Sequence, residues 1–151
     1  MAITLAGMKG YECLAIASRT QAHADDFATK HGIARSYGSY EELVKDDDVE
    51  LVYIATPHAL HYEHARLCIE HNKPILCEKA FTANAYEAEV LLNLAENRKV
   101  FITEAIWTRY MPLSLKIIEL VRQGVIGHPY ILTANLCYPV SEKERMQRPE
   151  L

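Results

Sequence analysis

The sequence predicts an α/β protein with a mostly parallel, doubly wound sheet. Short apolar runs alternate with helical patterns along the chain, which is typical of a parallel sheet covered by helices. The runs are brief and bounded by turn residues, as buried parallel strands are. The chain has 151 residues, of which 50% are hydrophobic, and this suits one ordinary domain with a core.

The first half of the chain alternates two short strands with two capped helices and ends in a third strand. Thr20 is the expected N-cap of a helix over 21–31, and Gly32 its expected stop. Ser39, followed by Glu42 three residues later, predicts a capping box for a helix over 40–45. The strands expected in this half cover residues 14–17, 36–37 and 51–55.

The second half continues the alternation with strands at 74–77 and 100–103. Asn84 is the expected N-cap of a helix that runs to residue 97, and Gly124 is the expected stop of a helix over 113–123. A weak alternation over 130–138 predicts a strand of a second sheet. Helical spacing predicts one shared face in 60–71, made of Leu60, His64, Leu67 and Cys68, and an apolar stripe in 84–97, made of Ala88, Leu91, Leu92 and Ala95. In 113–123 it predicts a face toward a core, made of Leu115, Ile118 and Val121.

Composition argues against several classes of protein. The net charge of -4 disfavours a nucleic-acid partner. No apolar run approaches the length of a bilayer span, and no targeting segment is visible, so we expect no membrane association. The four cysteines are scattered without CxxC spacing, which favours reduced thiols and a cytoplasmic location.

Two polar segments follow apolar runs at the point where each predicted strand ends. Thr56-Pro57-His58 follows the run at 51–55, and Glu78-Lys79 follows the run at 74–77. In an open α/β sheet, ligands bind just beyond the carboxyl ends of the strands. These two segments therefore predict a cofactor site.

The motifs resemble those of a known enzyme family. Cys77-Glu78-Lys79 is similar to the Glu-Lys-Pro signature of the glucose–fructose oxidoreductase/inositol dehydrogenase (Gfo/Idh/MocA) family, although Ala80 stands where the family has proline. The stretch Glu-Ala-Ile-Trp-Thr-Arg-Tyr-Met-Pro at 104–112 resembles the branch that contains dimeric dihydrodiol dehydrogenase and NADP-dependent D-xylose dehydrogenases. The resemblance extends from about Gly10 to the end of the chain.

The resemblance implies an incomplete Rossmann-type domain. Residues 1–112 are expected to form a partial NAD(P)-binding domain without its first strand and glycine turn, which leaves two strands unpaired. Residues 1–6 resemble the end of the family's first helix, with Gly7 as its stop. Residues 113–151 are expected to be the first helix and strand of a truncated α/β substrate domain. Full-length relatives are expected to form homo-oligomers.

The resemblance also implies an NAD(P)-dependent oxidoreductase that dehydrogenates a secondary alcohol of a sugar or a trans-dihydrodiol. Lys79 is the expected catalytic residue, because an ammonium beside the substrate hydroxyl steadies the charge that develops on oxygen as hydride leaves. It would act with a Tyr or His general acid/base. The alternative is a surface lysine paired with Glu78.

NADP is the expected cofactor, with NAD less favoured. Ser18 and Arg19 follow the first predicted strand, where NAD enzymes carry an acidic residue, and they are able to hydrogen-bond a 2′-phosphate. The alternative for Arg19 is an ordinary position at the start of a helix. The other cofactor-binding residues that the resemblance implies are Thr56, Pro57, His58, His61, Glu78, Lys79, Trp107 and Arg109.

Several alternatives stand beside these assignments. His58, His61 and His64 are spaced by three, but without an H-E-x-x-H pattern we expect no metal site. Cys77 lacks an activating pattern and is more simply a buried thiol, and Trp107 is alternatively a hinge-packing aromatic. An inactive or partner-binding fragment of such an enzyme is the main rival function, and a flavodoxin-like regulatory domain is a weaker one.

Overall fold

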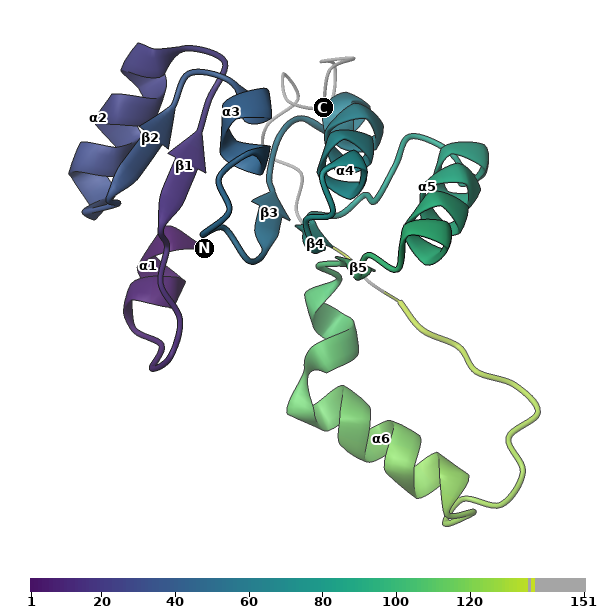
Figure 1. Ribbon diagram of the computed structural model, residues 1–151. Coiled ribbons are helices and arrows are strands. Elements are labelled where there is room, and N and C mark those ends of the chain that lie inside the picture. The colour runs from purple at the N-terminus through teal and green to yellow at the C-terminus, as the bar shows by residue number, and fades with distance from the viewer. Residues whose placement is uncertain (136, 138–151) are drawn as a thin grey trace. The chain divides into compact units, whose positions relative to one another are not determined.

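The computed structural model describes residues 1–135 and 137. The chain divides into two compact units, Met1–Glu104 and Ala105–Leu151. The second unit begins with a 3₁₀ helix η2 (Trp107–Tyr110) and a helix α6 (Pro112–Arg122). The first unit holds every strand of the described residues. Its elements in chain order are α1 (Ala2–Ala6), β1 (Ala15–Ala17), α2 (Gln21–His31), β2 (Arg35–Tyr37), α3 (Tyr40–Val44), β3 (Val52–Ile54), η1 (His58–Leu60), α4 (His61–Glu70), β4 (Ile75–Cys77), α5 (Ala85–Arg98) and β5 (Ile102–Glu104) (Figure 1).

The strands of the first unit form two parallel sheets, one with the order β1-β2 and one with the order β3-β4-β5. Helices alternate with the strands, so the predicted α/β class with a parallel sheet is confirmed. Among the described residues, β1, β2, β3 and β5 each pair along one edge only, and β4 pairs along both. Figure 1 shows β1 and β3 running in the same direction.

The predicted helix caps are confirmed. The side chains of Thr20, Ser39 and Asn84 each accept a hydrogen bond from the backbone N–H three residues later, at 3.4, 3.2 and 3.0 Å. Gly32 ends α2 with a φ of 67°, a left-handed conformation that glycine adopts without the steric cost of a Cβ. Local side-chain chemistry therefore sets the limits of these helices.

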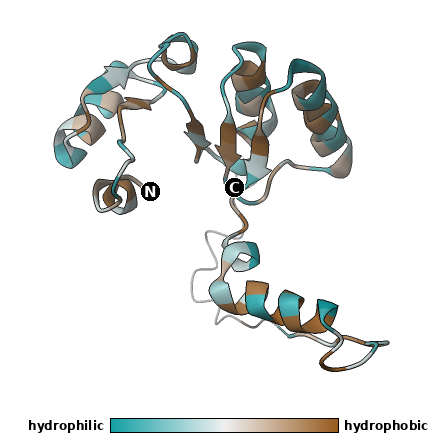
Figure 2. Cartoon of the chain, turned by 60° about the horizontal axis from the view of Figure 1, so that its bottom comes forward, coloured by the Kyte–Doolittle hydropathy of each residue, from teal (hydrophilic) through white to brown (hydrophobic). Residues whose placement is uncertain are grey.

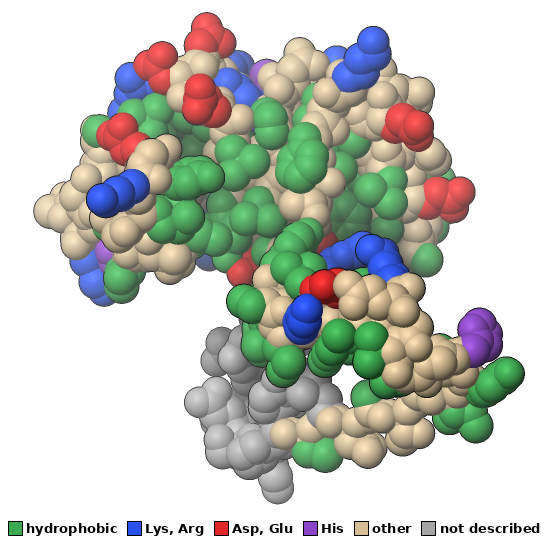
Figure 3. All heavy atoms as spheres, turned by 90° about the horizontal axis from the view of Figure 1, so that it is seen from below, with side chains coloured by type: hydrophobic (Ala, Val, Ile, Leu, Met, Phe, Trp, Pro, Cys, Tyr) green, Lys and Arg blue, Asp and Glu red, His purple; other side chains and the backbone are tan. Residues whose placement is uncertain are grey.

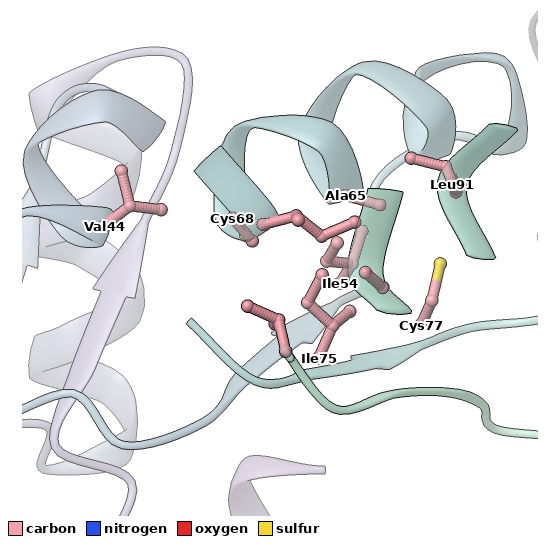
Figure 4. Close-up of a cluster of buried hydrophobic side chains, with 10 residues drawn as sticks. Val44, Ile54, Ala65, Cys68, Ile75, Cys77 and Leu91 are labelled. Carbon is pink, nitrogen blue, oxygen red and sulfur yellow. The ribbon is translucent and has the colours of Figure 1, made fainter. Parts of the chain in front are cut away.

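The core lies between the three-stranded sheet and helices α4 and α5 (Figure 4). Ile69, Ile75, Cys77 and Leu91 have no exposed surface. Burying a side chain of the size of Leu or Ile contributes roughly 1.5–3 kcal/mol. The buried cluster consists of Val44, Ile54, Ala65, Cys68, Ile69, Ile75, Cys77, Leu91, Ala95 and Val100.

The predicted helix faces agree with the structure in part. The buried residues of α4 are His61, Ala65, Cys68 and Ile69. Of the predicted face, Cys68 is buried and Leu67 packs against the buried cluster, whereas Leu60, which lies in the 3₁₀ helix before α4, and His64 are half-buried. In α5, Leu91 and Ala95 are buried as predicted, but Leu92 is 51% exposed.

The second unit departs further from expectation. Helix α6 has no buried residue, and Leu115 and Ile118 are 54% and 41% exposed, so their predicted core positions are wrong. Figure 2 shows hydrophobic and hydrophilic residues alternating along α6. Figure 3 shows hydrophobic side chains at the surface of the second unit.

The strand predicted at 130–138 is also absent from residues 130–135 and 137, while residues 136 and 138 lie outside the described residues. A strand needs a neighbour for its hydrogen bonds, and the described part of this unit contains no other strand. No helix among the described residues has both the length and the apolar character needed to cross a membrane.

Candidate functional site

The candidate site lies beyond the carboxyl ends of β3 and β4. These strands are parallel, and Ile54 pairs with Cys77 at their ends. Thr56 and Lys79 each come two residues after that pair, so the register brings the two predicted segments to the same edge of the sheet. The ligand site of an open α/β sheet is expected at this edge.

His61 ties these two segments together. Its side chain has no exposed surface, its Nδ1 atom lies 2.7 Å from the carbonyl oxygen of Ala80, and its Nε2 atom lies 2.9 Å from the carbonyl oxygen of Thr56. Both ring nitrogens therefore lie against backbone carbonyl oxygens, and a nitrogen that carries a hydrogen donates it to its carbonyl. The family resemblance assigned His61 to cofactor binding. In the structure its side chain is buried between the loop that follows β3 and the loop that follows β4.

Glu78 is held by a tyrosine that the sequence analysis did not single out. The Tyr53 hydroxyl donates a hydrogen bond to the Glu78 carboxylate, and the backbone N–H of Lys79 donates to its second oxygen at 3.2 Å. Tyr53 pairs with Leu76, and Glu78 follows two residues later on the same face of the sheet, within reach of a tyrosine. Burial, reinforced by the Glu78 carboxylate, raises the pKa of Tyr53, so the phenol stays a donor.

Glu104 supports the turn from the neighbouring strand. Its carboxylate accepts a hydrogen bond from the backbone N–H of Phe81 at 3.0 Å. Cys77, which pairs with Glu104 across the strands, donates from its Sγ to the Phe81 carbonyl at 3.8 Å. Burial, with the carboxylates of Glu104 and Glu78 adding to it, raises the pKa of Cys77 to about 12. This thiol is therefore protonated at neutral pH and poorly suited to act as a nucleophile.

Lys79 stands between these supports with its side chain exposed. Its ammonium has no hydrogen-bond or ion-pair partner among the residues that the structure describes. The ion pair with Glu78, considered above as the ordinary role of this lysine, is not formed. The peptide bond between Lys79 and Ala80 is cis.

Ser18 and Arg19 follow β1 and precede α2. The Ser18 N–H donates to the Tyr37 carbonyl at 3.1 Å, which extends the β1-β2 ladder by one bond and leaves the serine half-buried. Arg19 is exposed, and no partner for its guanidinium is found in the described part of the chain. A cation is thus available next to a helix N-terminus, which itself favours an anion.

Thr56 is also bonded through its side chain. Its hydroxyl Oγ1 lies 2.9 Å from Nδ1 of His64. The rings of His58 and His61 meet edge to face with centroids 5.4 Å apart. Within the described residues, no three His, Cys, Asp or Glu side chains converge as metal ligands.

Comparison with known proteins identifies the family. Residues 2–105 match the model of an oxidoreductase family with an NAD-binding Rossmann fold, GFO_IDH_MocA. The chain belongs to this family.

Relatives and a solved structure are consistent with that membership. The chain is 45% identical over 130 residues to D-xylose 1-dehydrogenase (NADP(+)) of Hypocrea jecorina, covering 83% of this chain and 33% of that protein. It is 39% identical over 125 residues to trans-1,2-dihydrobenzene-1,2-diol dehydrogenase of Danio rerio, covering 83% and 37%. The 3-ketoreductase KijD10 of Actinomadura kijaniata, in complex with TDP-benzene and NADP, superposes with a TM-score of 0.72 at 29% identity, covering 83% and 40%. The chain thus spans between 33% and 40% of the length of these proteins.

Two of the site residues expected from the family resemblance lie in the second unit. Trp107 and Arg109 belong to η2, both are exposed, and the Arg109 N–H donates to the Ile106 carbonyl at 3.0 Å. Their role in lining a cleft stays a prediction.

A hollow of about 400 Å³ lies between α3 and α4 of the Rossmann unit, away from Lys79. Three carboxylates line it, those of Glu41, Glu63 and Glu70, and its cation Arg66 is already paired with Glu70 at 2.8 Å. The net negative charge of this lining repels the phosphates of a dinucleotide. The hollow is therefore a poorer cofactor site than the strand ends.

Sequence reasoning missed Tyr53 and Glu104 as parts of the site. Each stands in a strand that was interpreted only as core or as part of a motif. The signal was in the strand register, because Tyr53 lies opposite Leu76 and Glu104 lies opposite Cys77. That register becomes known only when the strands are paired.

Proposed function

We propose that this protein is the nucleotide-binding part of an NADP-dependent oxidoreductase. The proposed reaction interconverts a secondary alcohol and its carbonyl, on a sugar or a trans-dihydrodiol. The observation that carries the proposal is the exposed ammonium of Lys79, without a partner among the described residues, at the carboxyl edge of a parallel sheet. It is held there by contacts to the residues on either side of it. The names of the xylose and dihydrodiol dehydrogenases support the substrate class.

The residues present fit an NADP molecule. Arg19 offers an unpaired guanidinium and Ser18 a hydroxyl directly after β1, and neither would repel a 2′-phosphate as a carboxylate would. Thr56, Pro57 and His58 would border the cofactor at the end of β3, and Glu78 at the end of β4. When bound, the nicotinamide supplies the acceptor or donor of hydride.

Lys79 would act on the oxygen of the substrate. An ammonium there stabilises negative charge on that oxygen, and one such donor is worth roughly 3–4 kcal/mol of barrier. His61 would contribute indirectly, because its two contacts hold the Thr56 and Ala80 carbonyls. Trp107 and Arg109 are further residues that we assign to cofactor binding.

Titration of the chain with NADPH and with NADH tests the proposal. We expect saturable binding of one NADPH, followed by calorimetry and by the fluorescence of Trp107, the single tryptophan. NADH should bind about ten- to a hundredfold more weakly, since hydrogen bonds to a charged group are worth about 1.5–3 kcal/mol. Absence of saturable NADPH binding by a chain with native circular dichroism would contradict the proposal.

The second candidate function is a fragment that binds a partner without redox chemistry. The observation that favours it is that β1 and β3 each leave one strand edge unpaired, and such edges are able to pair with another chain. The same titration separates the two, because this candidate predicts a folded chain with no affinity for NADPH.

We also propose a reducing, cytoplasmic location and a homo-oligomeric full-length protein. The first is supported by the cysteines Cys13, Cys68, Cys77 and Cys137, all of which are free thiols. Size-exclusion chromatography of a full-length relative tests the second.

A further inference from the structure

The Glu78 carboxylate is the nearest acidic group to Lys79 along the chain, yet it does not bind the Lys79 ammonium. One of its oxygens accepts the Tyr53 hydroxyl and the other accepts the Lys79 backbone N–H. Each carboxylate oxygen thus already accepts one hydrogen bond, and both of these bonds hold the carboxylate away from the ammonium.

The position of Tyr53 explains this arrangement. Tyr53 stands on the central residue of β3, opposite Leu76 of β4. Because side chains alternate along a strand, Glu78 falls on the same face of the sheet as Tyr53. The phenol therefore holds the carboxylate on that face of the sheet. Lys79, the next residue, remains exposed.

We propose that Tyr53 is a positioning residue that sequesters the Glu78 carboxylate and so keeps the Lys79 ammonium available to a substrate oxygen. The proposal rests on the proposed function of Lys79 and assigns to that site a residue outside the motif. Removal of the hydroxyl would release the carboxylate, which would then pair with the ammonium and compete with the substrate.

The backbone of the turn does not depend on this hydroxyl. The Ala80 carbonyl is held by His61 and the Phe81 N–H by Glu104. The loss of the phenolic oxygen would therefore change the partner of the carboxylate and leave the path of the chain intact. Burial keeps the pKa of Tyr53 raised, so the phenol is a hydrogen-bond donor throughout the neutral range.

The test is the chemical reactivity of Lys79, measured in the full chain without any cofactor. Acetic anhydride at low molar excess acylates only the unprotonated amine, and mass spectrometry gives the labelled fraction of Lys79 relative to the exposed Lys30 in the same sample. In Tyr53→Phe a newly paired carboxylate stabilises the ammonium by the energy of a surface ion pair. We expect the relative labelling of Lys79 to fall about two- to fivefold.

In the double variant Tyr53→Phe/Glu78→Gln, the labelling of Lys79 should return to the level of the unmodified chain, because this variant lacks the Glu78 carboxylate. Tyr86→Phe, which removes the hydroxyl of a tyrosine that is 74% exposed, is the matched control and should leave it unchanged. Unchanged labelling in Tyr53→Phe would overturn the proposal, as would an equal loss of labelling in the double variant.

If Tyr53→Phe does not fold, the labelling of Lys79 in Glu78→Gln alone tests the proposal. The proposal expects labelling at the level of the unmodified chain, whereas a rise of twofold or more would mean that Glu78 already pairs with Lys79. Since the reagent needs no nucleotide, this result is independent of whether the chain binds NADPH.

Discussion

The Nδ1 atom of His61 lies 2.7 Å from the carbonyl oxygen of Ala80. This contact joins the start of α4 to the residue that follows Lys79. Since Nε2 of the same ring reaches the Thr56 carbonyl, one buried side chain holds the loops at the ends of both β3 and β4. The geometry of the candidate site therefore depends on a side chain with no exposed surface.

We expect His61→Ala to destabilise the first unit by about 2–4 kcal/mol. The substitution opens a cavity at a fully buried position and leaves two carbonyl groups without their partner. Urea unfolding followed by circular dichroism measures the change. His23→Ala, on the exposed face of α2, is the control and should cost less than about 0.5 kcal/mol. A similar small cost for both variants would show that His61 does not support the loops.

We expect Arg19→Ala to weaken NADPH binding about ten- to a hundredfold and to leave NADH binding nearly unchanged. The guanidinium would lose a charge-assisted hydrogen bond to the 2′-phosphate, which NADH lacks. Calorimetric titration of the variant with both nucleotides measures this, and Lys30→Ala in the same helix region serves as the control. Equal weakening for the two nucleotides would place Arg19 elsewhere than at the 2′-phosphate.

Lys79→Ala, made in a full-length relative that carries the same segment, should lower turnover about a hundredfold or more while the affinity for NADPH stays within about threefold. The ammonium is assigned to the transition state and not to cofactor affinity. Steady-state kinetics and cofactor titration of one preparation measure both quantities. Lys45→Ala, an exposed lysine at the end of α3, should alter neither. Normal turnover in Lys79→Ala would remove this lysine from the mechanism.

The sequence was sufficient for features that depend on local chemistry. The N-caps Thr20, Ser39 and Asn84 are where the pattern predicted them, because a cap needs only the backbone N–H groups a few residues away. The polar segments at Thr56 and Lys79 were found for a similar reason, since a strand end followed by a helix start is visible in one stretch of chain.

The features that the sequence did not predict depend on contacts between distant segments. His61 is among the buried residues of α4 and Leu92 of α5 is 51% exposed, because the packing of each helix against its neighbours decides which face is covered. The bond from Tyr53 to Glu78 requires the register of β3 on β4, which helical and strand periodicity within each segment leaves open.

Asp46 should make the stability of the first unit depend on acidic pH. The Arg35 guanidinium at 2.7 Å, and then the Tyr37 hydroxyl at 2.8 Å, lower the pKa of Asp46 from 3.8 to about 2. A carboxylate with a lowered pKa in the folded state stabilises that state above its unfolded pKa, and the contribution is lost as pH falls through the folded value. We therefore expect Asp46→Asn to be less stable than the unmodified chain at pH 7, and the difference to shrink as pH falls from about 4 through about 2.

Urea unfolding across that range measures the effect of Asp46. Asp47→Asn, an exposed neighbour for which the structure shows no bond, is the control and should show no comparable change. If Asp46→Asn and the unmodified chain differed in free energy of unfolding as much at pH 2 as at pH 7, the stabilisation would not come from the charged carboxylate.

His64 should titrate below the usual histidine value. Burial lowers the pKa of His64 from 6.5; the nearby Glu63 and Glu41 oppose this shift, and His61 adds to it. The unfolded chain therefore takes up the proton first, so the stability that neutral His64 contributes is complete above pH 6.5 and is lost as pH falls below it. We expect the NMR signal of the His64 ring to titrate with a midpoint below 6.5. His64→Gln should show a smaller loss of stability between pH 7.5 and pH 5.5 than the unmodified chain. A midpoint at or above 6.5 would mean that the carboxylates outweigh burial, and the bond to Thr56 would then persist in the protonated state.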